Sequence, residues 1–334
     1  MPGANTSGYR TRRQVKYTIT RYGGFRLPPI TGLIKVIIKI TTKLVNVREL
    51  SIDLWDSAPY YDLQPLFSSF LSSFGPKLHT LSLNGNLENF LTLIKDPKFD
   101  GLQDLCIDFT GTAGRAIIVD VLLPFINSLA PHLLSLRLWS RASLDLSTFF
   151  AQLAPLPSLK TLTIQTRFQK AFGNTSGLED LFCDNSGTLQ RVHLCLNPAG
   201  LTADSEEPLS LWFLEYISDI TRFSYLLQIL DLHPTEMDAG MEFLLDCIER
   251  SSKSLADLNV RDRFLQDGGI EAIINVAPSY SNLIFLKMKI RKLDVALTDH
   301  SALKLPKIDR LRLSIREYAV DDSKYLVVCV RYRN

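Results

Sequence analysis

Four side chains with metal-ligand or acid–base chemistry lie in two short segments that alternate apolar and polar residues. His193 and Cys195 are two positions apart, and so are Asp231 and His233. Side chains two positions apart on a β-strand point to the same face of a sheet. If the two segments are neighbouring strands, these four side chains converge, and zinc accepts such a donor set. A flat pleated face supplies tetrahedral geometry poorly, so we interpret the four as polar residues of an exposed face, with zinc binding as the alternative.

The carboxylates of Asp104 and Asp108 are a second candidate for chemistry, because paired carboxyl groups can act as general acid and base. They are expected on a face open to water and without a pocket, which does not favour catalysis. The sequence also lacks the patterns G-x-x-x-x-G-K-[ST], G-x-G-x-x-G, H-E-x-x-H and G-x-S-x-G. We therefore predict that the protein is not an enzyme and has no catalytic residues, metal or cofactor.

A repeated motif sets the elements that must position these residues. Leu-x-x-Leu-x-Leu, with conservative replacements, occurs ten times at a mean spacing of 29 residues. One strand-like motif per period of this length is typical of leucine-rich repeats. Such repeats must stack, because one repeat cannot bury its apolar face alone. The motifs begin at Val47, Leu78, Leu102, Leu133, Leu159, Leu189, Leu227, Leu255, Leu283 and Ile308.

Between the motifs the apolar period changes from 2 to about 3.6, which predicts a helical return in each repeat. The stripes lie in residues 30–44, 63–74 and 117–129, and prolines such as Pro76 and Pro131 help to end the helices. The sequence thus predicts an α/β leucine-rich-repeat solenoid, a horseshoe of about 10–11 repeats with a parallel concave sheet and convex helices. Segment 197–210 is predicted to be an insertion loop.

The motifs resemble the ribonuclease-inhibitor-like class of leucine-rich repeats, and within it the repeat region of fungal F-box and leucine-rich-repeat proteins. The resemblance covers about residues 30–315 and is best in LRELSIDL, PKLHTLSLNGN, PSLKTLTIQT and KSLADLNVRD. It implies a substrate receptor in ubiquitin ligation, in which an F-box recruits the ligase and the repeats hold the substrate. Leu27-Pro28-Pro29 is similar to an F-box start, but ITGLIKVIIKITTKL runs directly into the first motif. We interpret that segment as a repeat helix, so no F-box is evident.

Composition indicates an ordinary globular chain of 334 residues, with 46% hydrophobic and 22% charged residues. We predict a basic, disordered leader at 1–14 and one repeat domain at 15–334. The ends are expected to carry a leading strand near Tyr17 and a trailing strand at 326–330, and to have either degenerate caps or a shortened chain. With no secretory h-region, no apolar run of membrane-spanning length and five scattered cysteines, the protein is expected to be cytoplasmic or nuclear, with reduced thiols and no membrane partner.

Charge is unevenly distributed along the chain. Residues 1–48 contain ten Lys or Arg and no acid, and subtracting these from the total of +2 leaves −8 for the rest. In the strands, residues between the motif leucines should face the concave side, with equivalent positions in columns about 4.8 Å apart. Acids, including Glu49, Asp53, Asp104 and Asp108, gather in the first three repeats of these columns, and basic residues dominate from the fourth.

We therefore predict a protein–protein interaction scaffold, acting as a monomer, whose concave face binds a partner with an acidic segment. Trp139 is expected to be exposed between two arginines and to act as a contact hot spot. The alternatives are a nucleic-acid-associated protein, which the pI of about 8.2 disfavours, and a degenerate structural repeat protein. The predicted partner-binding residues are Arg137, Trp139, Arg191, His193, His233, Arg261, Lys287, Lys289, Arg310 and Arg312.

Overall fold

The computed structural model places most of the repeat region. It describes residues 17–18, 30–44, 46–54, 63–95, 99–109, 115–140, 145–166, 174–196, 209, 211–212, 214, 226–233, 238–265, 267–276, 282–292, 299, 303–305, 307–316 and 326–331. The predicted leader at 1–14, Leu27-Pro28-Pro29 and most of the predicted insertion loop lie outside the described residues.

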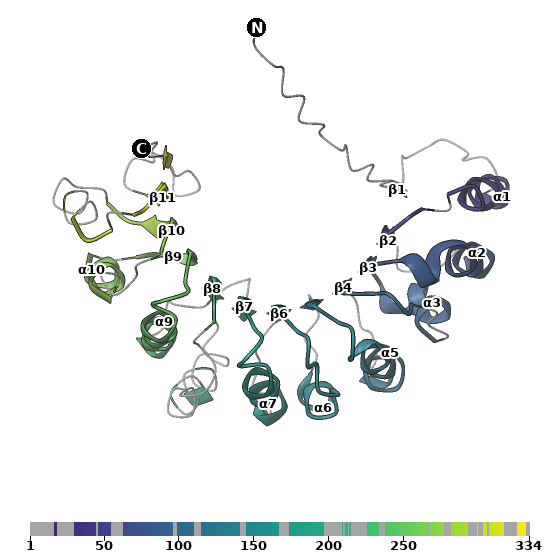
Figure 1. Ribbon diagram of the computed structural model, residues 1–334, viewed down its shortest axis with the longest axis horizontal. Coiled ribbons are helices and arrows are strands. Elements are labelled where there is room, and N and C mark those ends of the chain that lie inside the picture. The colour runs from purple at the N-terminus through teal and green to yellow at the C-terminus, as the bar shows by residue number, and fades with distance from the viewer. Residues whose placement is uncertain are drawn as a thin grey trace, which may run out of the picture.

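One sheet of twelve strands runs through the described chain in sequence order. The strands line the inner side of an arc, and the helices form a separate layer on its outer side (Figure 1). Strands β1 to β11 pair in parallel, and β12 pairs antiparallel with β11. The strands are β1 Tyr17–Thr18, β2 Glu49–Leu54, β3 Thr80–Gly85, β4 Asp104–Phe109, β5 Ser135–Ser140, β6 Thr161–Thr166, β7 Arg191–Leu196, β8 Ile229–His233, β9 Asp257–Leu265, β10 Phe285–Ile290, β11 Arg310–Ile315 and β12 Leu326–Arg331.

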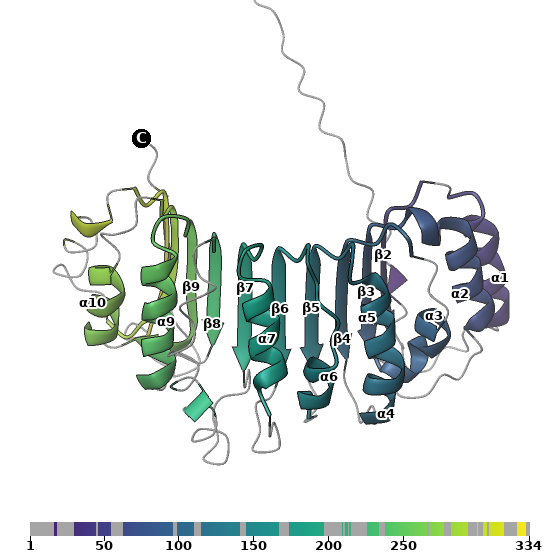
Figure 2. The same cartoon turned by 60° about the horizontal axis from the view of Figure 1, so that its bottom comes forward.

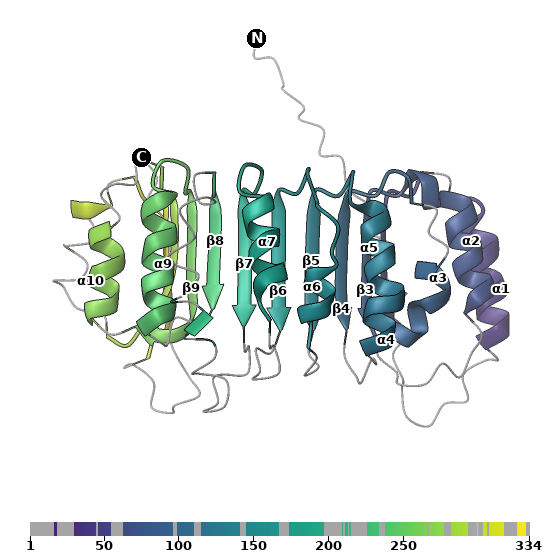
Figure 3. The same ribbon diagram turned by 90° about the horizontal axis from the view of Figure 1, so that it is seen from below.

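Each of the ten predicted motifs forms one strand, from β2 to β11. Leu78, Leu81 and Leu83 occupy the first, fourth and sixth motif positions and are at most 1% exposed, as the motif predicts. The labelled helices, α1 to α7, α9 and α10, stand beside the strands in a separate layer (Figures 2 and 3). The predicted fold class is therefore confirmed: the described chain is an α/β leucine-rich-repeat solenoid.

The convex layer is built from short helices that bury one stripe. In α2, Leu66, Phe67, Phe70 and Phe74 are buried, and a 3₁₀ turn containing Pro76 follows the helix. The α-helices are α1 Ile30–Thr41, α2 Gln64–Phe74, α3 Leu91–Lys95, α4 Arg115–Ile117, α5 Leu123–Leu129, α6 Ser147–Ala151, α7 Ser176–Asp184, α9 Asp238–Arg250 and α10 Asp267–Val276. Gly75–Lys77 and Leu87–Phe90 are 3₁₀ helices.

The predicted helix over 117–129 is interrupted by a π-helical turn at Ile118–Leu122. Pro124 stands at the start of the following helix and has no amide hydrogen to donate. The amide of Leu123 instead donates to the carbonyl oxygen of Ile118, five residues earlier. The proline thus accounts for a wider turn within an otherwise continuous apolar stripe.

A backbone ladder links successive repeats just before each strand. The amides of His79 and Thr80 both donate to the carbonyl oxygen of Arg48, at 2.8 and 3.0 Å. The same arrangement, one carbonyl accepting two amides from the next repeat, recurs at each following junction up to the entry to β11. These bonds satisfy backbone groups that the sheet leaves unpaired and hold neighbouring repeats in one register.

The two ends of the sheet confirm the expected flanking strands. β1 is two residues long, and β12 pairs along all six residues of β11 with reversed polarity. The segment after Leu27-Pro28-Pro29 forms α1, which contacts α2 in the convex layer. The hydroxyl oxygens of Thr41 in α1 and Ser69 in α2 are 3.0 Å apart. This supports the interpretation of that segment as a repeat helix.

Candidate functional site

The concave face carries the columns that the motif predicts, because the strands pair in the expected register. The column that begins with Ser51 continues without a shift through every strand to Arg312. The neighbouring column runs from Asp53 to His233 in the same way. Side chains from ten repeats therefore share one face, and their chemistry divides that face into three regions.

The acidic end comprises Glu49, Asp53, Asp104 and Asp108 on β2 to β4. Its carboxylates bond to polar side chains on neighbouring strands: Asn84 donates to Asp53. Thr80 donates to Asp104 at 3.4 Å. The columns of these three strands contain no Lys or Arg. Hydrogen bonds across the strands therefore moderate the negative charge of this end of the concave face.

The central cluster comprises Arg137, Trp139, Arg191, His193 and His233 on β5, β7 and β8. Arg137 is exposed, but Trp139 is half-buried, which corrects the prediction of an exposed indole. Trp139 Nε1 is buried and has no hydrogen-bond partner among the described residues. Strand pairing places the indole beside Asp108 and Gln165, so neighbouring columns cover much of the ring.

Cys106 lies beside the central cluster, directly opposite Arg137 in the strand pairing. Burial raises the pKa of the Cys106 thiol, while a hydrogen bond with Ser82 and the charge of Arg137 act in the opposite direction. The net shift is upward, so the thiol stays protonated where an ordinary cysteine begins to ionise. Cys106 is therefore a polar packing residue of the face and not an activated nucleophile.

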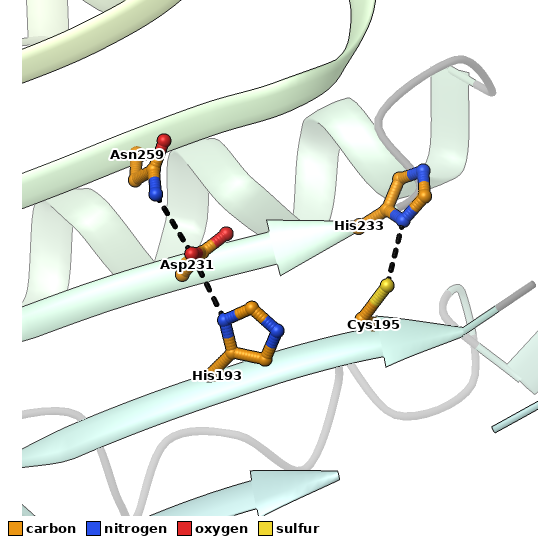
Figure 4. Close-up of polar contacts among 5 residues, drawn as sticks. All are labelled: His193, Cys195, Asp231, His233 and Asn259. Carbon is orange, nitrogen blue, oxygen red and sulfur yellow. Dashed lines mark hydrogen bonds and ion pairs between the residues drawn. The ribbon is translucent and has the colours of Figure 1, made fainter. Parts of the chain in front are cut away.

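The four side chains that could have converged on zinc form two separate pairs (Figure 4). His193 Nδ1 lies 2.9 Å from Asp231 Oδ2, and Asn259 donates to the same oxygen at 2.7 Å. Cys195 Sγ lies 2.9 Å from His233 Nδ1. Within the described residues, no group of three or more His, Cys, Asp or Glu side chains is arranged to hold a metal ion. Both pairs therefore join β7 to β8, and Asn259 extends the first pair to β9.

The basic end comprises Lys287, Lys289, Arg310 and Arg312 on β10 and β11. Lys287 and Arg312 are direct strand partners. The guanidinium carbon of Arg310 lies 4.8 Å from the centre of the Phe285 ring, and Arg310 Nη2 lies 4.0 Å from Asp257 Oδ1. The side chain of Arg310 is still 48% exposed. Aromatic contact and a distant carboxylate therefore relieve the charge of this end in part.

Phe264 and Arg316 also belong to the basic end, although the motif did not indicate them. Lys289 Nζ and the guanidinium carbon of Arg316 lie 5.9 and 5.7 Å from the centre of the Phe264 ring. Phe264 reaches this position because pairing with β10 passes from Val260 directly to Leu265. Because of this irregularity, Arg261 is not the strand partner of Lys289 that the column predicted. The side chain of Arg261 lies outside the described residues.

The basic residues that were predicted as one site fall into two groups, those of the central cluster and those of the basic end. Arg191 and Arg310 occupy the same column four strands apart, about 19 Å at the usual strand spacing. Asp231 on β8 and Asp257 on β9 lie on the same face between them. A partner that contacts both groups must therefore span several strands and meet carboxylates between them.

The described helices include none that is both long and apolar enough to cross a membrane. No protein-family model and no curated protein matches the sequence. Among solved structures, the leucine-rich repeat-containing protein LegL7 from Legionella pneumophila is similar at a TM-score of 0.46 and 13% identity, over 87% of this chain and 89% of that chain.

Proposed function

We propose that this protein is a non-catalytic interaction scaffold whose concave face binds another protein, with an acidic segment of that partner over the basic end. The observation that carries the proposal is the direct pairing of Lys287 with Arg312 on neighbouring strands. Like charges in this arrangement destabilise a sheet, by about 0.2–1 kcal/mol per pair. An anionic segment would accept charge-assisted hydrogen bonds from the exposed guanidinium groups of Arg310 and Arg312.

The central cluster supplies the second part of the proposed contact. Arg137 is exposed, and Trp139 next to it combines a large ring with an indole N–H that lacks a partner among the described residues. Trp and Arg dominate the binding energy of many interfaces, and a hydrogen-bond acceptor from the partner would satisfy the indole. The two contact regions favour an extended partner that lies along the inner side of the arc.

Affinity purification from the source organism, followed by quantitative mass spectrometry, tests this proposal. The bait is the full chain, compared with Lys287→Glu/Arg312→Glu and with a matched control, Lys160→Glu/Lys253→Glu, at exposed positions outside the columns. Partners rich in Asp and Glu should be lost from the basic-end variant and kept by the control. Retention of all partners by a folded basic-end variant contradicts the proposal, and so does loss of the partners on nuclease treatment, which would assign the face to nucleic acid.

The finer form of the proposal is a substrate receptor in ubiquitin ligation, and it is supported by the resemblance of the repeats to fungal F-box proteins. It requires that a ligase adaptor be recovered with the chain. In this form of the proposal the adaptor binds outside the basic end, so it should remain bound to Lys287→Glu/Arg312→Glu while the acidic client is lost. Recovery of clients without any ligase component limits the function to scaffolding.

A further inference from the structure

Helix α1 presents two parallel rows of side chains on its outer face. Gly32, Val36 and Ile40 form one row, and Lys35, Lys39 and Lys43 form the other, each with a spacing of four residues. All six residues are exposed, and Lys43 extends the lysine row just past the end of the helix. Residues spaced by four lie above one another on a helix. The outer face is therefore a small apolar ridge flanked by a continuous positive ridge.

This face differs from those of the other labelled helices. Val36 is 54% exposed and Ile40 is 44% exposed, whereas α2 to α7, α9 and α10 expose no large apolar side chain among the described residues; outside these helices, the helical residues Leu211, Leu214 and Leu303 are also exposed. The apolar residues that serve the fold, Ile37 and Ile38, are half-buried on the opposite side. A Cβ atom at Gly32 would meet nothing within 4 Å. The ridge is thus accessible along its length and is not needed for packing on α2.

The charge around α1 is uncompensated by its own part of the sequence. Residues 1–48 contain ten basic residues and no acid, so the chain before α1 cannot supply carboxylates to the lysine row. Lysines spaced by four repel one another and weaken an isolated helix. An acidic surface placed against the lysine row would remove this repulsion.

We propose that the outer face of α1 docks an amphipathic helix of a partner protein, with a row of acidic residues beside Lys35, Lys39 and Lys43 and an apolar row on Val36 and Ile40. Two ridges with a spacing of four residues match the geometry by which ridges of one helix enter the grooves of another. Gly32 leaves room for close approach at one end of the ridge. A lipid surface would be a poorer match, because the larger apolar side of α1 is packed against the solenoid.

The docking surface lies on the convex layer, so it is independent of the concave face. It can be tested on the full chain with a fluorescent, stapled helical peptide that carries Leu and Glu rows at a spacing of four residues. The matched probe has Lys in place of Glu. Fluorescence anisotropy should show binding of the acidic peptide and at least tenfold weaker binding of the basic one.

The protein variants locate the binding site. Lys35→Glu/Lys39→Glu/Lys43→Glu should weaken binding of the acidic peptide about tenfold or more, because three surface ion pairs become repulsive contacts. Val36→Ser/Ile40→Ser should weaken it too, whereas Lys160→Glu/Lys253→Glu/Lys307→Glu should bind like the wild type. All the substituted residues are exposed, and unchanged circular dichroism and thermal midpoints would show that folding is intact.

Three outcomes would overturn this inference. If the acidic peptide binds the wild type but not Lys287→Glu/Arg312→Glu, it occupies the concave face. If vesicles of 30% phosphatidylserine in phosphatidylcholine bind through α1 while the acidic peptide does not, the surface recognises lipid. If sedimentation shows self-association that Lys35→Glu/Lys39→Glu/Lys43→Glu abolishes, the occupant is a second copy. None of these results alters the purification test of the concave face, so the two proposals can fail separately.

Discussion

Arg310 lies over the ring of Phe285, the residue directly opposite it on the neighbouring strand. The guanidinium carbon is 4.8 Å from the ring centre. A cation over an aromatic face is stabilised by about 0.5–1 kcal/mol at exposed sites. Arg310 Nη2 and Nε also lie 4.0 and 3.9 Å from carboxylate oxygens of Asp257 and Asp309, and the side chain is still 48% exposed. The ring and the two carboxylates thus restrict a long side chain at the basic end.

Replacement of Leu136 or Leu162 by Ala should lower the free energy of unfolding by roughly 2–5 kcal/mol, because each substitution leaves a cavity in the shared core. Both leucines are 1% exposed and lie directly opposite each other on β5 and β6. Urea unfolding followed by circular dichroism measures the effect. Arg137→Ala, on the exposed face of β5, is the control and should change stability by about 0.5 kcal/mol or less. Equal midpoints for Leu136→Ala and wild type would contradict the register.

Two glycine substitutions should have opposite effects on stability. Gly177 is the second residue of α7, and the backbone of α6 is so close to it that a Cβ atom would overlap Ala151, so Gly177→Ala should destabilise by about 1–3 kcal/mol. Gly268 in α10 is exposed with nothing within 4 Å, and Gly268→Ala should stabilise by about 0.4–1 kcal/mol. Thermal unfolding of both variants provides the comparison. A stabilised Gly177→Ala protein would show that α6 and α7 are further apart.

Asp231→Ala should destabilise the protein by about 1–3 kcal/mol, because it leaves Asn259 and His193 without their shared acceptor. Asp231 is 6% exposed. The control is Asp257→Ala, whose side chain is 28% exposed and contacts Arg310 at 4.0 Å, and its effect should be smaller. Chemical denaturation separates the two, and equal losses would argue against a buried role for Asp231.

The cysteines should differ sharply in reactivity. Cys329 is exposed, whereas Cys247 is buried and its thiol pKa is raised above the ordinary 9.0 by burial and by the charge of Asp246. A raised pKa keeps the thiol neutral as pH increases through 9, so Cys247 lacks the thiolate that alkylation requires. Mass spectrometry after iodoacetamide treatment at pH 8 should find Cys329 modified first, Cys106 slowly, and Cys247 only on unfolding. Rapid modification of Cys247 in the folded protein would contradict this environment.

Much of the fold could be predicted because every motif has the same alternation of apolar and polar residues over a few positions. Alternation around Leu81 and Leu136 determines which side chains enter the core, and the same alternation determines the concave columns. The exposure of Trp139 was predicted wrongly, because a column position specifies direction but not how closely the neighbouring columns cover a large ring. Phe264 was missed because it depends on an irregularity in β9, which no periodic pattern indicates. The pairing of His193 with Asp231 followed from the register, whereas the separation of the four polar residues into two pairs depended on rotamers.

The curvature of the solenoid affects the electrostatic potential in the space that it encloses. Strands β2 to β4 and β10 to β11 stand on opposite sides of the hollow (Figure 1). The acidic and basic ends therefore face each other across it, although they are far apart along the chain. Opposite charges on facing walls create a potential gradient across the space that they enclose. A dipolar molecule that approached along this space would be turned by that gradient before it touched the sheet, which would select its direction of entry. Added salt should remove this selection first, at separations beyond the Debye length of about 8–10 Å, while close contacts persist.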